Sequence, residues 1–184
     1  MNECAIATLP NGTLVMNARN YIGQKSFSVR RAIMWSNDEG SHWSDPYLSS
    51  DLPDPIVQGS MIAGSATPPS LGIGQPLFFT NAHTELDRAN DTLMMSTDGG
   101  ARWEKVFQVQ YGCSEYTGLV QFKDGRIGAG FDDGGPFSEG YEPRHAECKS
   151  RRTNETFVLI ELTKVEETRL KTDDFRANHH DVSH

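Results

Sequence analysis

The chain has 184 residues, with 17 glycines, 9 prolines and a formal net charge of −8. This length suits a single domain, while the negative net charge disfavours nucleic acid as a partner, because a phosphate-binding surface needs a concentrated basic face. No apolar stretch is long enough to span a membrane, and we expect no signal peptide near Met1 because polar residues interrupt the first positions.

Short apolar or alternating segments along the chain are predicted to form β-strands. In chain order they are Cys4–Leu9, Leu14–Asn17, Arg31–Trp35, Leu77–Thr80, Thr92–Ser96, Val106–Val109, Leu119–Phe122, Ile127–Phe131 and Thr156–Thr163. The turn sequences PNGT, NDEG, TDGG and KDGR lie between them, and their Asn, Asp and Gly residues supply the positive φ angles that hairpin turns need. The chain is therefore predicted to be an all-β antiparallel meander.

Two stretches, Ser49–Gln75 and Asp132–Thr153, contain no such segment. They are predicted to be long loops, where binding and catalytic residues often lie. The polar residues from about Glu166 onward are predicted to form a frayed tail, so the histidines of its NHHDVSH end are not expected to bind metal.

One pattern, Ser-x-Asp-x-Gly-x-x-Trp, occurs twice, at Ser36–Trp43 and at Ser96–Trp103. Its aspartate can accept hydrogen bonds from amides inside the turn, its glycine adopts a conformation that other residues resist, and its tryptophan packs beside the strands. Repetition of one hairpin turn in successive small sheets is typical of a β-propeller, where such turns are called Asp boxes. Asp38 and Asp98 are therefore predicted to be structural and not catalytic.

Cysteines and histidines give little functional signal. Cys4, Cys113 and Cys148 are far apart and odd in number, which argues against a disulfide framework and against a zinc site. We therefore expect reduced, structural thiols. His42 and His83 are expected to have surface or loop roles.

Five segments, taken in order, resemble the C-terminal half of sialidases, particularly the lysosomal-type and bacterial exo-α-sialidases with a six-bladed propeller. They are NECAIATLPNGTLVMNAR (Asn2–Arg19), DLPDPIVQGSMI (Asp51–Ile62), LFFTNAHTELDRANDTL (Leu77–Leu93), CSEYTGLVQFKDGRIGAGFDDG (Cys113–Gly134) and TFVLIELTKVE (Thr156–Glu166). The resemblance implies that residues 1–165 are the C-terminal part of a sialidase-like β-propeller, with about three to four blades. Residues 166–184 would be a polar, disordered tail.

The resemblance also implies a site for a sugar that carries a carboxylate on its anomeric carbon. Guanidinium groups suit such a ligand because they bind a carboxylate bidentately and stay charged at any working pH. Arg19 and Arg88 match two of the family's three carboxylate-binding arginines, whereas without the resemblance each would be interpreted as a surface arginine in an ion pair. Arg30, Arg31 and Arg102 are expected to be solvated or strand-edge charges.

Sialidases use a tyrosine nucleophile, unlike most glycosidases, which use two carboxylates. A carboxylate would be repelled by the substrate's own carboxylate, whereas a phenol arrives neutral and, with an ordinary pKa of about 10, needs a partner base. Tyr116 in SEYTGL matches this nucleophile and Glu3 in NEC matches its partner; the alternative is a half-buried sheet aromatic and a frayed terminal charge. Gln58 in VQGS matches a loop residue that lines the sugar site, although a sheet-edge hydrogen bond explains it as well.

The resemblance also fails at specific places. The family's first arginine and its acid/base aspartate belong to an N-terminal half that this chain is expected to lack. Asp132 stands where the family has a glutamate that supports the missing arginine, and Glu115 stands where the family has a small residue. We therefore expect a fragment, or one part, of a longer sialidase, and we expect the 184-residue chain to be inactive by itself.

The resemblance predicts an exo-α-sialidase that hydrolyses terminal sialic acid from glycoproteins, glycolipids or oligosaccharides with retention, and without a metal or other cofactor. Its partners would be sialylated glycans and the missing N-terminal half of the same propeller, with no nucleic acid and no membrane span. The compartment would be lysosomal or secreted if the full-length protein carries a signal peptide, and cytoplasmic otherwise. The alternative is a non-catalytic propeller fragment that binds a glycan or a protein.

Overall fold

The computed structural model describes residues 1–20, 30–65, 75–135, 148 and 154–162. Its strands are β1 (Asn2–Thr8), β2 (Leu14–Arg19), β3 (Arg30–Ser36), β4 (Tyr47–Pro53), β5 (Ser60–Ala63), β6 (Leu77–Ala82), β7 (Asp91–Ser96), β8 (Glu104–Gln108), β9 (Cys113–Gln121), β10 (Ile127–Gly135) and β11 (Asn154–Ile160). They form three antiparallel sheets, with the orders β1-β2-β3-β4, β5-β6-β7-β8 and β11-β10-β9. The predicted all-β fold is confirmed, and the predicted polar tail lies outside the described residues.

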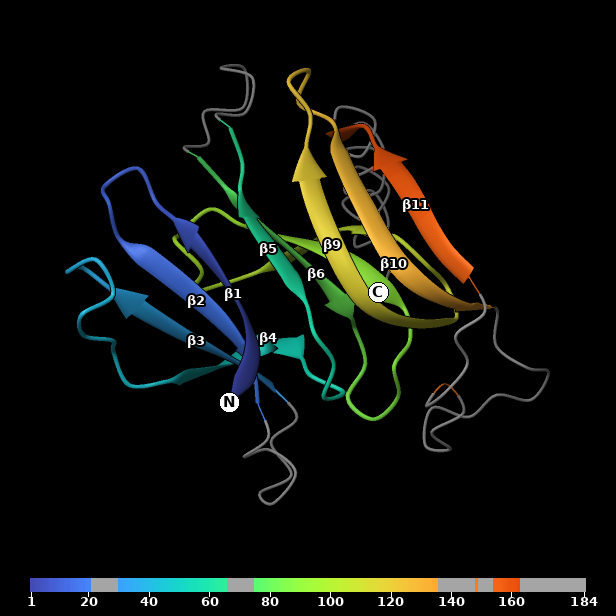
Figure 1. The fold of residues 1–184 in the computed structure, drawn as a ribbon, viewed down its shortest axis with the longest axis horizontal. Coiled ribbons are helices and arrows are strands. Elements are labelled where there is room, and N and C mark those ends of the chain that lie inside the picture. The colour runs from blue at the N-terminus through green and yellow to red at the C-terminus, as the bar shows by residue number, and fades with distance from the viewer. Residues whose placement is uncertain (21–29, 66–74, 136–147, 149–153, 163–184) are drawn as a thin grey trace, which may run out of the picture.

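The three sheets lie side by side, and β5 lies between β1 and β9 in the middle of the molecule (Figure 1). Within each sheet every strand pairs with the strand that precedes or follows it in the chain. Short turns between consecutive antiparallel strands favour this order, because each strand finds its partner next in sequence. The described residues thus build three neighbouring blades of a propeller, at the lower end of the expected number.

β5 lies within the Ser49–Gln75 stretch that the sequence predicts to be a loop, and β4 begins just before that stretch and continues into it. β4 carries two serines and an aspartate and is the outer strand of its sheet, so it lacks a clear apolar pattern. β5 has only 4 residues. β9 also begins at Cys113 and not at the predicted Leu119, and this earlier start places Tyr116 within a strand.

The first Asp box forms the turn that its sequence predicts. Ser36 Oγ accepts a hydrogen bond from Gly40 N at 2.9 Å, and Asp38 Oδ1 accepts one from His42 N at 2.9 Å. Gly40 has a φ angle of 87°, in the left-handed region that favours glycine. The turn therefore satisfies its own backbone and leaves Asp38 in a structural role.

The second Asp box repeats this arrangement. Ser96 Oγ accepts from Gly100 N at 2.8 Å, and Asp98 Oδ1 accepts from Arg102 N at 2.9 Å. The indole of Trp103 donates to the Gly100 carbonyl at 3.0 Å and is buried in the core. The predicted packing of the box tryptophan against the strands is confirmed here.

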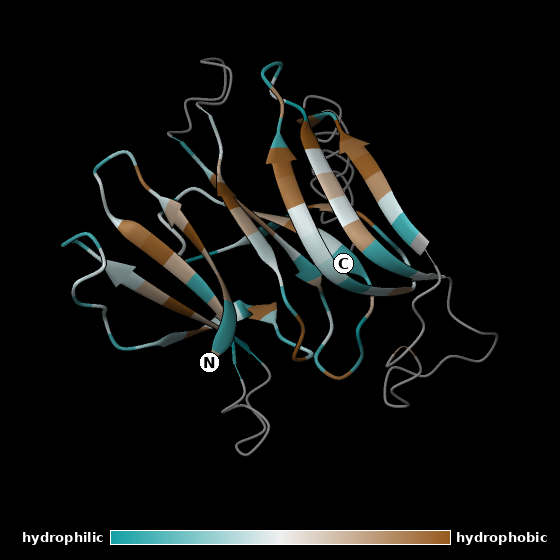
Figure 2. Cartoon of the chain, viewed as in Figure 1, coloured by the Kyte–Doolittle hydropathy of each residue, from teal (hydrophilic) through white to brown (hydrophobic). Residues whose placement is uncertain are grey.

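Two hydrophobic clusters hold the three sheets together. One lies between the first and second sheets and contains Val15, Ile33 and Phe79. The other lies between the second and third sheets and contains Phe78 and Phe131. Phe78 and Phe79 are neighbours on β6, and successive side chains of a strand point to opposite faces, so the middle sheet is packed on both sides. Hydrophobic residues follow the strands, while hydrophilic residues gather in the hairpin turns (Figure 2).

Gly59, just before β5, tests this packing. A Cβ atom added there would lie 2.4 Å from Phe79 Cζ and 2.8 Å from Thr80 O, whereas one added at Gly118 would meet nothing within 4 Å. Because of this overpacking we expect Gly59→Ala to lower the free energy of unfolding by about 1–3 kcal/mol. Gly118→Ala is the matched control and should change it by less than about 0.5 kcal/mol. Urea denaturation measures both, and equal effects would contradict the packing.

Candidate active site

Arg88 and Tyr116, the predicted carboxylate-binding residue and the predicted nucleophile, lie together. Arg88 is in the connection between β6 and β7, and its guanidinium carbon lies 6.0 Å from the centroid of the Tyr116 ring on β9. Arg88 Nη1 donates to Glu115 Oε2 at 2.7 Å, and Nη2 donates to the Ile56 carbonyl at 2.9 Å. The unusual Glu115 is therefore the ionic partner of Arg88. Contacts from two different segments hold the guanidinium beside the tyrosine.

Arg19 and Glu3 form a second ion pair where β1 begins and β2 ends. The strand register pairs Asn2 with Arg19 and then shifts before Ala5, and Glu3 lies in this irregularity with a φ angle of 44°. Such a φ is uncommon for a residue with a side chain, and a bulge of this kind redirects side chains. The carboxylate of Glu3 thereby reaches the buried Arg19 guanidinium. Its predicted partnership with Tyr116 stays a prediction.

A short loop between β4 and β5, residues 54–58, connects the surroundings of both arginines, and we call it the hub loop. Asp54 Oδ2 accepts from Asn20 N at 2.7 Å, directly after β2, and Asp54 Oδ1 accepts from Ile56 N at 2.9 Å. Ile56 has a φ angle of 60°, a strained value for a β-branched residue. In this conformation the Ile56 carbonyl accepts the hydrogen bond that Arg88 Nη2 donates.

Gln58, at the end of the hub loop, contacts β9. Its Oε1 accepts from Thr117 N at 2.9 Å, next to Tyr116 in the chain. This bond agrees with the sheet-edge alternative for Gln58, and its predicted role in lining a sugar site stays a prediction. The hub loop thus contacts segments of all three sheets.

Arg31 differs from its prediction as a solvated or strand-edge charge, because it is completely buried. Its Nε donates to Asn17 Oδ1 at 2.8 Å, its Nη1 donates to the Val57 carbonyl at 2.8 Å, and Nη1 lies 3.6 Å from Asp54 Oδ1. Burial lowers the pKa of Arg31 to about 10, although the Asp54 charge opposes this shift, so the guanidinium remains charged at neutral pH. A charged side chain on the inward face of β3 is tolerated only because it is paired.

Asp132 lies opposite Glu115 in the register of β9 and β10. With Tyr116 it lines a hollow of about 440 Å³ on the third sheet. The other lining residues are Gly130, Phe131, Glu155, Thr156 and Phe157. The structure therefore brings Asp132 and Tyr116 to one hollow, while the predicted support of an arginine by Asp132 stays a prediction.

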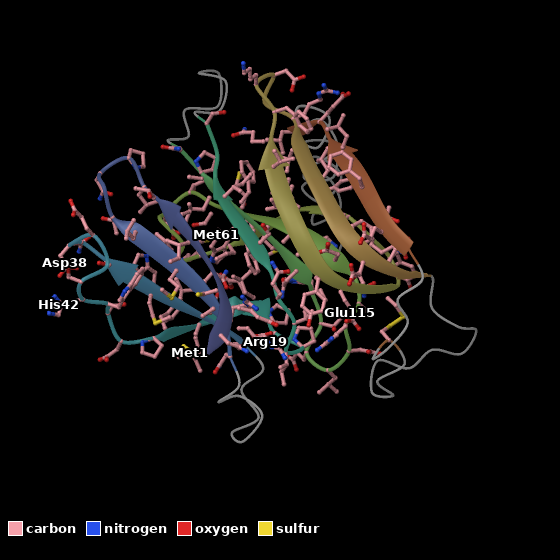
Figure 3. The ribbon with its side chains drawn as sticks, in the orientation of Figure 1. Met1, Arg19, Asp38, His42, Met61 and Glu115 are labelled. Atoms are coloured by element: carbon pink, nitrogen blue, oxygen red, sulfur yellow. A yellow bond between two sulfur atoms is a disulfide. The ribbon has the colours of Figure 1, made fainter. Side chains whose placement is uncertain are left out.

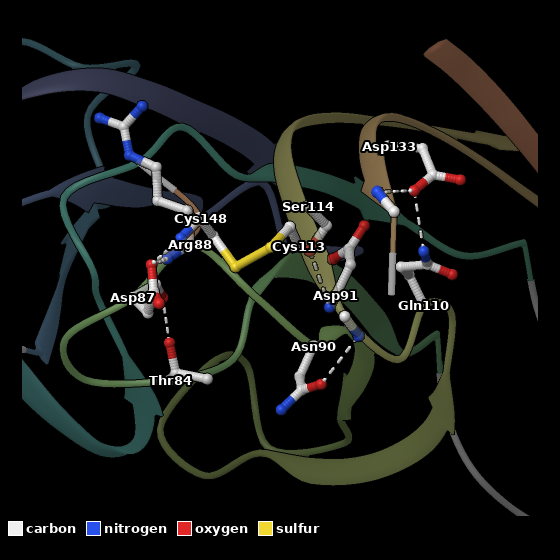
Figure 4. Close-up of a disulfide and its surroundings, with 12 residues drawn as sticks. Thr84, Asp87, Arg88, Asn90, Asp91, Gln110, Cys113, Ser114, Asp133 and Cys148 are labelled. Atoms are coloured by element: carbon white, nitrogen blue, oxygen red, sulfur yellow. Dashed lines mark hydrogen bonds between the residues drawn. A yellow bond between two sulfur atoms is a disulfide. The ribbon is translucent and has the colours of Figure 1, made fainter. Parts of the chain in front are cut away.

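Cys113 and Cys148 are joined by a disulfide (Figure 4). Cys4 is free and exposed. The expectation of reduced thiols is therefore wrong for this pair. The two cysteines are 35 positions apart, a spacing that carries no disulfide signal by itself. Only the folded chain brings Cys148 to the first residue of β9.

The Asp boxes lie apart from these residues. In the view of Figure 3, Arg19 and Glu115 lie in the lower middle of the molecule, whereas Asp38 and His42 lie at its left edge. His42 Nδ1 is 2.6 Å from Asp38 Oδ2, and the His42 side chain is 89% exposed. This placement agrees with a structural turn.

The described residues contain neither a metal-binding cluster nor a membrane-spanning helix. No group of three or more histidine, cysteine, aspartate or glutamate side chains in this part of the chain could hold a metal ion. No helix in the same residues is long and apolar enough to cross a membrane.

Comparison with known proteins places the chain among proteins with repeated Asp boxes. Residues 1–129 match the family described as BNR repeat-like domain. The chain is 31% identical to a sialidase of Micromonospora viridifaciens over 137 residues, which cover 73% of this chain and 20% of that protein. The solved structure of the Hadza microbial sialidase Hz136 matches with a TM-score of 0.59 and 27% identity, over 71% of this chain and 25% of that one. The NanB sialidase of Streptococcus pneumoniae matches with a TM-score of 0.66 and 15% identity, over 88% of this chain and 23% of that one.

The chain therefore belongs to the BNR repeat-like domain family, the Asp-box family in which its relatives are sialidases. The likeness to NanB, at 15% identity, shows the propeller fold alone. The chain spans about a fifth of the length of the curated relatives it matches. Because one fold hosts many activities, the activity has to be argued from the site.

Two titratable groups have pKa values far from their ordinary ones: Asp91, which is buried, and His83, which is partly buried. Asp91, at the start of β7, accepts from Thr80 Oγ1 at 2.6 Å and its amide donates to Ser114 Oγ at 3.1 Å. Burial raises the pKa of Asp91 to about 6, against the opposing hydrogen bonds of Thr80 and Thr117. Burial, followed by nearby positive charge, lowers the pKa of His83 to about 4.

These shifts predict opposite effects of pH on stability. Between pH 3.8 and about 6, folded Asp91 keeps a proton that the unfolded chain has lost, so stability falls as pH rises. Between about 4 and 6.5, unfolded His83 holds a proton that the folded chain excludes, so stability rises with pH. In the wild type we expect these two effects on the free energy of unfolding to offset each other. In Asp91→Asn only the His83 effect remains, so the free energy of unfolding should rise with pH by up to about 1.4 kcal/mol per pH unit. Urea denaturation across this pH window measures the free energy of unfolding. In His83→Gln only the Asp91 effect remains, so the free energy of unfolding should fall as pH rises. Identical profiles for wild type and Asp91→Asn would contradict the assignment.

Arg31 and Arg30 are adjacent in sequence and give a matched pair of variants. Arg31→Met would leave Asp54 buried without its cation, and we expect it to lower the free energy of unfolding by about 3–5 kcal/mol. Arg30 is partly exposed and pairs with Glu85 at 2.6 Å. Arg30→Met should therefore cost less than about 1 kcal/mol. Chemical denaturation measures both, and similar small losses would show that the buried ion pair does not support the fold.

Proposed function

We propose that this chain carries part of the site of an exo-α-sialidase, which removes terminal sialic acid from glycoproteins, glycolipids or oligosaccharides with retention. One observation carries the proposal: Arg88 is held beside the Tyr116 ring by Glu115 and by the Ile56 carbonyl. A guanidinium fixed next to a phenol is the arrangement that a sugar with a carboxylate at its anomeric carbon requires. Sialidase relatives support this choice of sugar.

The carboxylate-binding part of the site consists of Arg19 and Arg88. A guanidinium has five N–H donors, and the bonds of Arg88 to Glu115 and to Ile56 engage two of them. A substrate carboxylate can therefore be bound by Arg88 while its protein partners still hold it. Arg19 is likewise oriented by Glu3. Pre-oriented cations of this kind stabilise the bound anion without reorganising during the reaction.

Tyr116 is the proposed nucleophile. Its phenol oxygen would form a bond to the anomeric carbon as the aglycone leaves, and water would then displace the tyrosine, which gives retention after two inversions. Glu3 would take the phenol proton, an assignment that rests on the resemblance. The acid that protonates the aglycone has no matching residue in this chain. We propose that it, and a further arginine, come from the N-terminal half of the same propeller.

A second class of function is a non-catalytic propeller part that binds a glycan or a protein. The acid of the family site has no match among the residues of this sequence, which favours this class, because a site with part of its residues can bind without reacting. Sialoside binding without turnover is the result that this alternative expects.

The carboxylate clamp can be tested by comparing two ligands that differ only in charge. The α-methyl glycoside of sialic acid should bind the 184-residue chain about 10 to 100 times more tightly than its carboxamide, because charge-assisted hydrogen bonds contribute about 1.5–3 kcal/mol. Arg88→Met should abolish this difference, while Arg102→Met, at an exposed Asp-box position, should leave it intact. NMR titration at pH 7 measures the ratio. Equal binding of acid and amide by the wild type overturns the proposed sugar site.

Release of a fluorophore from an α-sialoside separates the two classes. We expect turnover near background for this chain, since a positioned acid or base contributes about 10²–10⁴-fold. Any turnover above background should disappear in Tyr116→Phe. Turnover that survives this change would exclude Tyr116 as the nucleophile, and robust turnover by the wild type would show that the acid lies within this chain.

A further inference from the structure

We propose that the Cys113–Cys148 disulfide and the Asp87 carboxylate together form a brace that positions Arg88 and the start of β9. In this proposal Arg88 and Tyr116 are held in their relative positions only in the oxidised chain. Its role toward substrate rests on the proposed function, whereas its effect on the backbone does not. Asp87, Cys113 and Cys148 are positioning residues in this proposal, because they act through Arg88 and Tyr116.

The disulfide fixes the start of the strand that carries Glu115 and Tyr116. Cys113 is the first residue of β9, and both sulfur-bearing side chains are buried in a small cluster with Ala89. Ala89 also forms an isolated β-bridge with Cys113. The disulfide ties Cys148 to β9, and the Ala89–Cys113 bridge ties β9 to the connection that carries Arg88, so the three segments meet at one point.

Asp87 links the disulfide to Arg88. Its Oδ1 accepts from the amide of Arg88 at 3.0 Å and from the amide of Cys148 at 3.0 Å (Figure 4). The Arg88 carbonyl in turn accepts from Ser114 N at 2.9 Å. The backbone of Arg88 is thus held at its amide and at its carbonyl, while Glu115 and Ile56 hold its guanidinium.

Loss of the disulfide would release one side of this arrangement. Cys148 would no longer be tied to β9, and the completely buried Asp87 carboxylate would lose a hydrogen-bond donor. A buried carboxylate with too few donors favours a rearranged connection. The guanidinium of Arg88 would then move relative to Tyr116, and a displacement of about 1 Å is enough to impair a site of this kind.

The brace also predicts where the protein works. Formation of the disulfide removes two protons and two electrons from two thiols. Another molecule that carries a disulfide accepts them by thiol–disulfide exchange and leaves as a dithiol. Such bonds persist in oxidising compartments and are reduced in the cytosol. The site is therefore expected to assemble outside a reducing compartment.

A thiol count gives the first test. The chain purified without reductant and then denatured should show one reactive thiol, from Cys4, and all three of its cysteines should react after treatment with a phosphine. Three reactive thiols before reduction overturn the proposal. Cys4→Ser is the control and should remove the single signal.

Hydrogen exchange tests the positioning without any ligand. In Cys113→Ser/Cys148→Ser, the amide of Ser114 should exchange at least about tenfold faster than in the wild type. The amide of Gly100, in the second Asp box, should be unchanged. Unchanged exchange at Ser114 overturns the brace.

Two variants at Asp87 keep the disulfide. They test the brace even if the double cysteine variant does not fold. Asp87→Asn retains an oxygen acceptor at Oδ1 and should keep slow exchange at Ser114, whereas Asp87→Ala should accelerate it. Equal exchange in these two variants overturns the proposed link.

The affinity ratio between the sialoside acid and its carboxamide connects the brace to the site. In Asp87→Ala this ratio should fall by about tenfold, with rescue in Asp87→Asn. Faster exchange with an unchanged ratio would show that the brace is structural only, which overturns its positioning role. If neither the wild type nor any variant binds the sialoside, the proposed function is contradicted and not the brace. The brace is then tested by hydrogen exchange at Ser114 alone.

Discussion

The buried ion pair between Arg31 and Asp54 is the interaction on which the rest of the structure depends. Arg31 extends from the first sheet to the hub loop, where it pairs with Asp54. The Asp54 carboxylate also accepts hydrogen bonds from the amides of Asn20 and Ile56. Removing either charge would leave the other one desolvated and unpaired, which is strongly unfavourable. The loop is therefore fixed to the sheet, and its Ile56 carbonyl is fixed in turn at the place where it binds Arg88.

Arg19 and Arg88, the two arginines proposed to bind a carboxylate, share one arrangement, in which each is paired with a carboxylate of the protein. Glu3 holds Arg19 and Glu115 holds Arg88. Both arrangements involve a left-handed residue with a side chain, Glu3 itself and Ile56 beside Arg88. Such conformations are unfavourable by about 1–3 kcal/mol each and persist only where surrounding contacts impose them. Their position beside the two guanidinium groups is consistent with a site that is organised before any ligand binds.

Scaffold and site occupy different parts of each blade. The Asp boxes connect the third and fourth strands, at the outer edge of their sheets, and satisfy their hydrogen bonds locally. The candidate site uses the ends of the inner strands β1 and β9 together with the hub loop. The repeated turns therefore indicate the propeller fold, whereas the proposed activity depends on residues that occur once.

The sequence by itself determined the turns and the strand alternation, because these depend on hydrogen bonds and side-chain directions within a few residues. Gly40 and Gly100 adopt the conformations that their Asp boxes predict. Resemblance to the sialidases also led to the prediction that Arg19, Arg88 and Tyr116 belong to the site, and the structure places Arg88 beside Tyr116. Only the tertiary structure decided that Arg31 is buried and that Cys113 meets Cys148. Those contacts join segments that are distant in the chain, so they are set by how the three sheets pack and not by any local pattern.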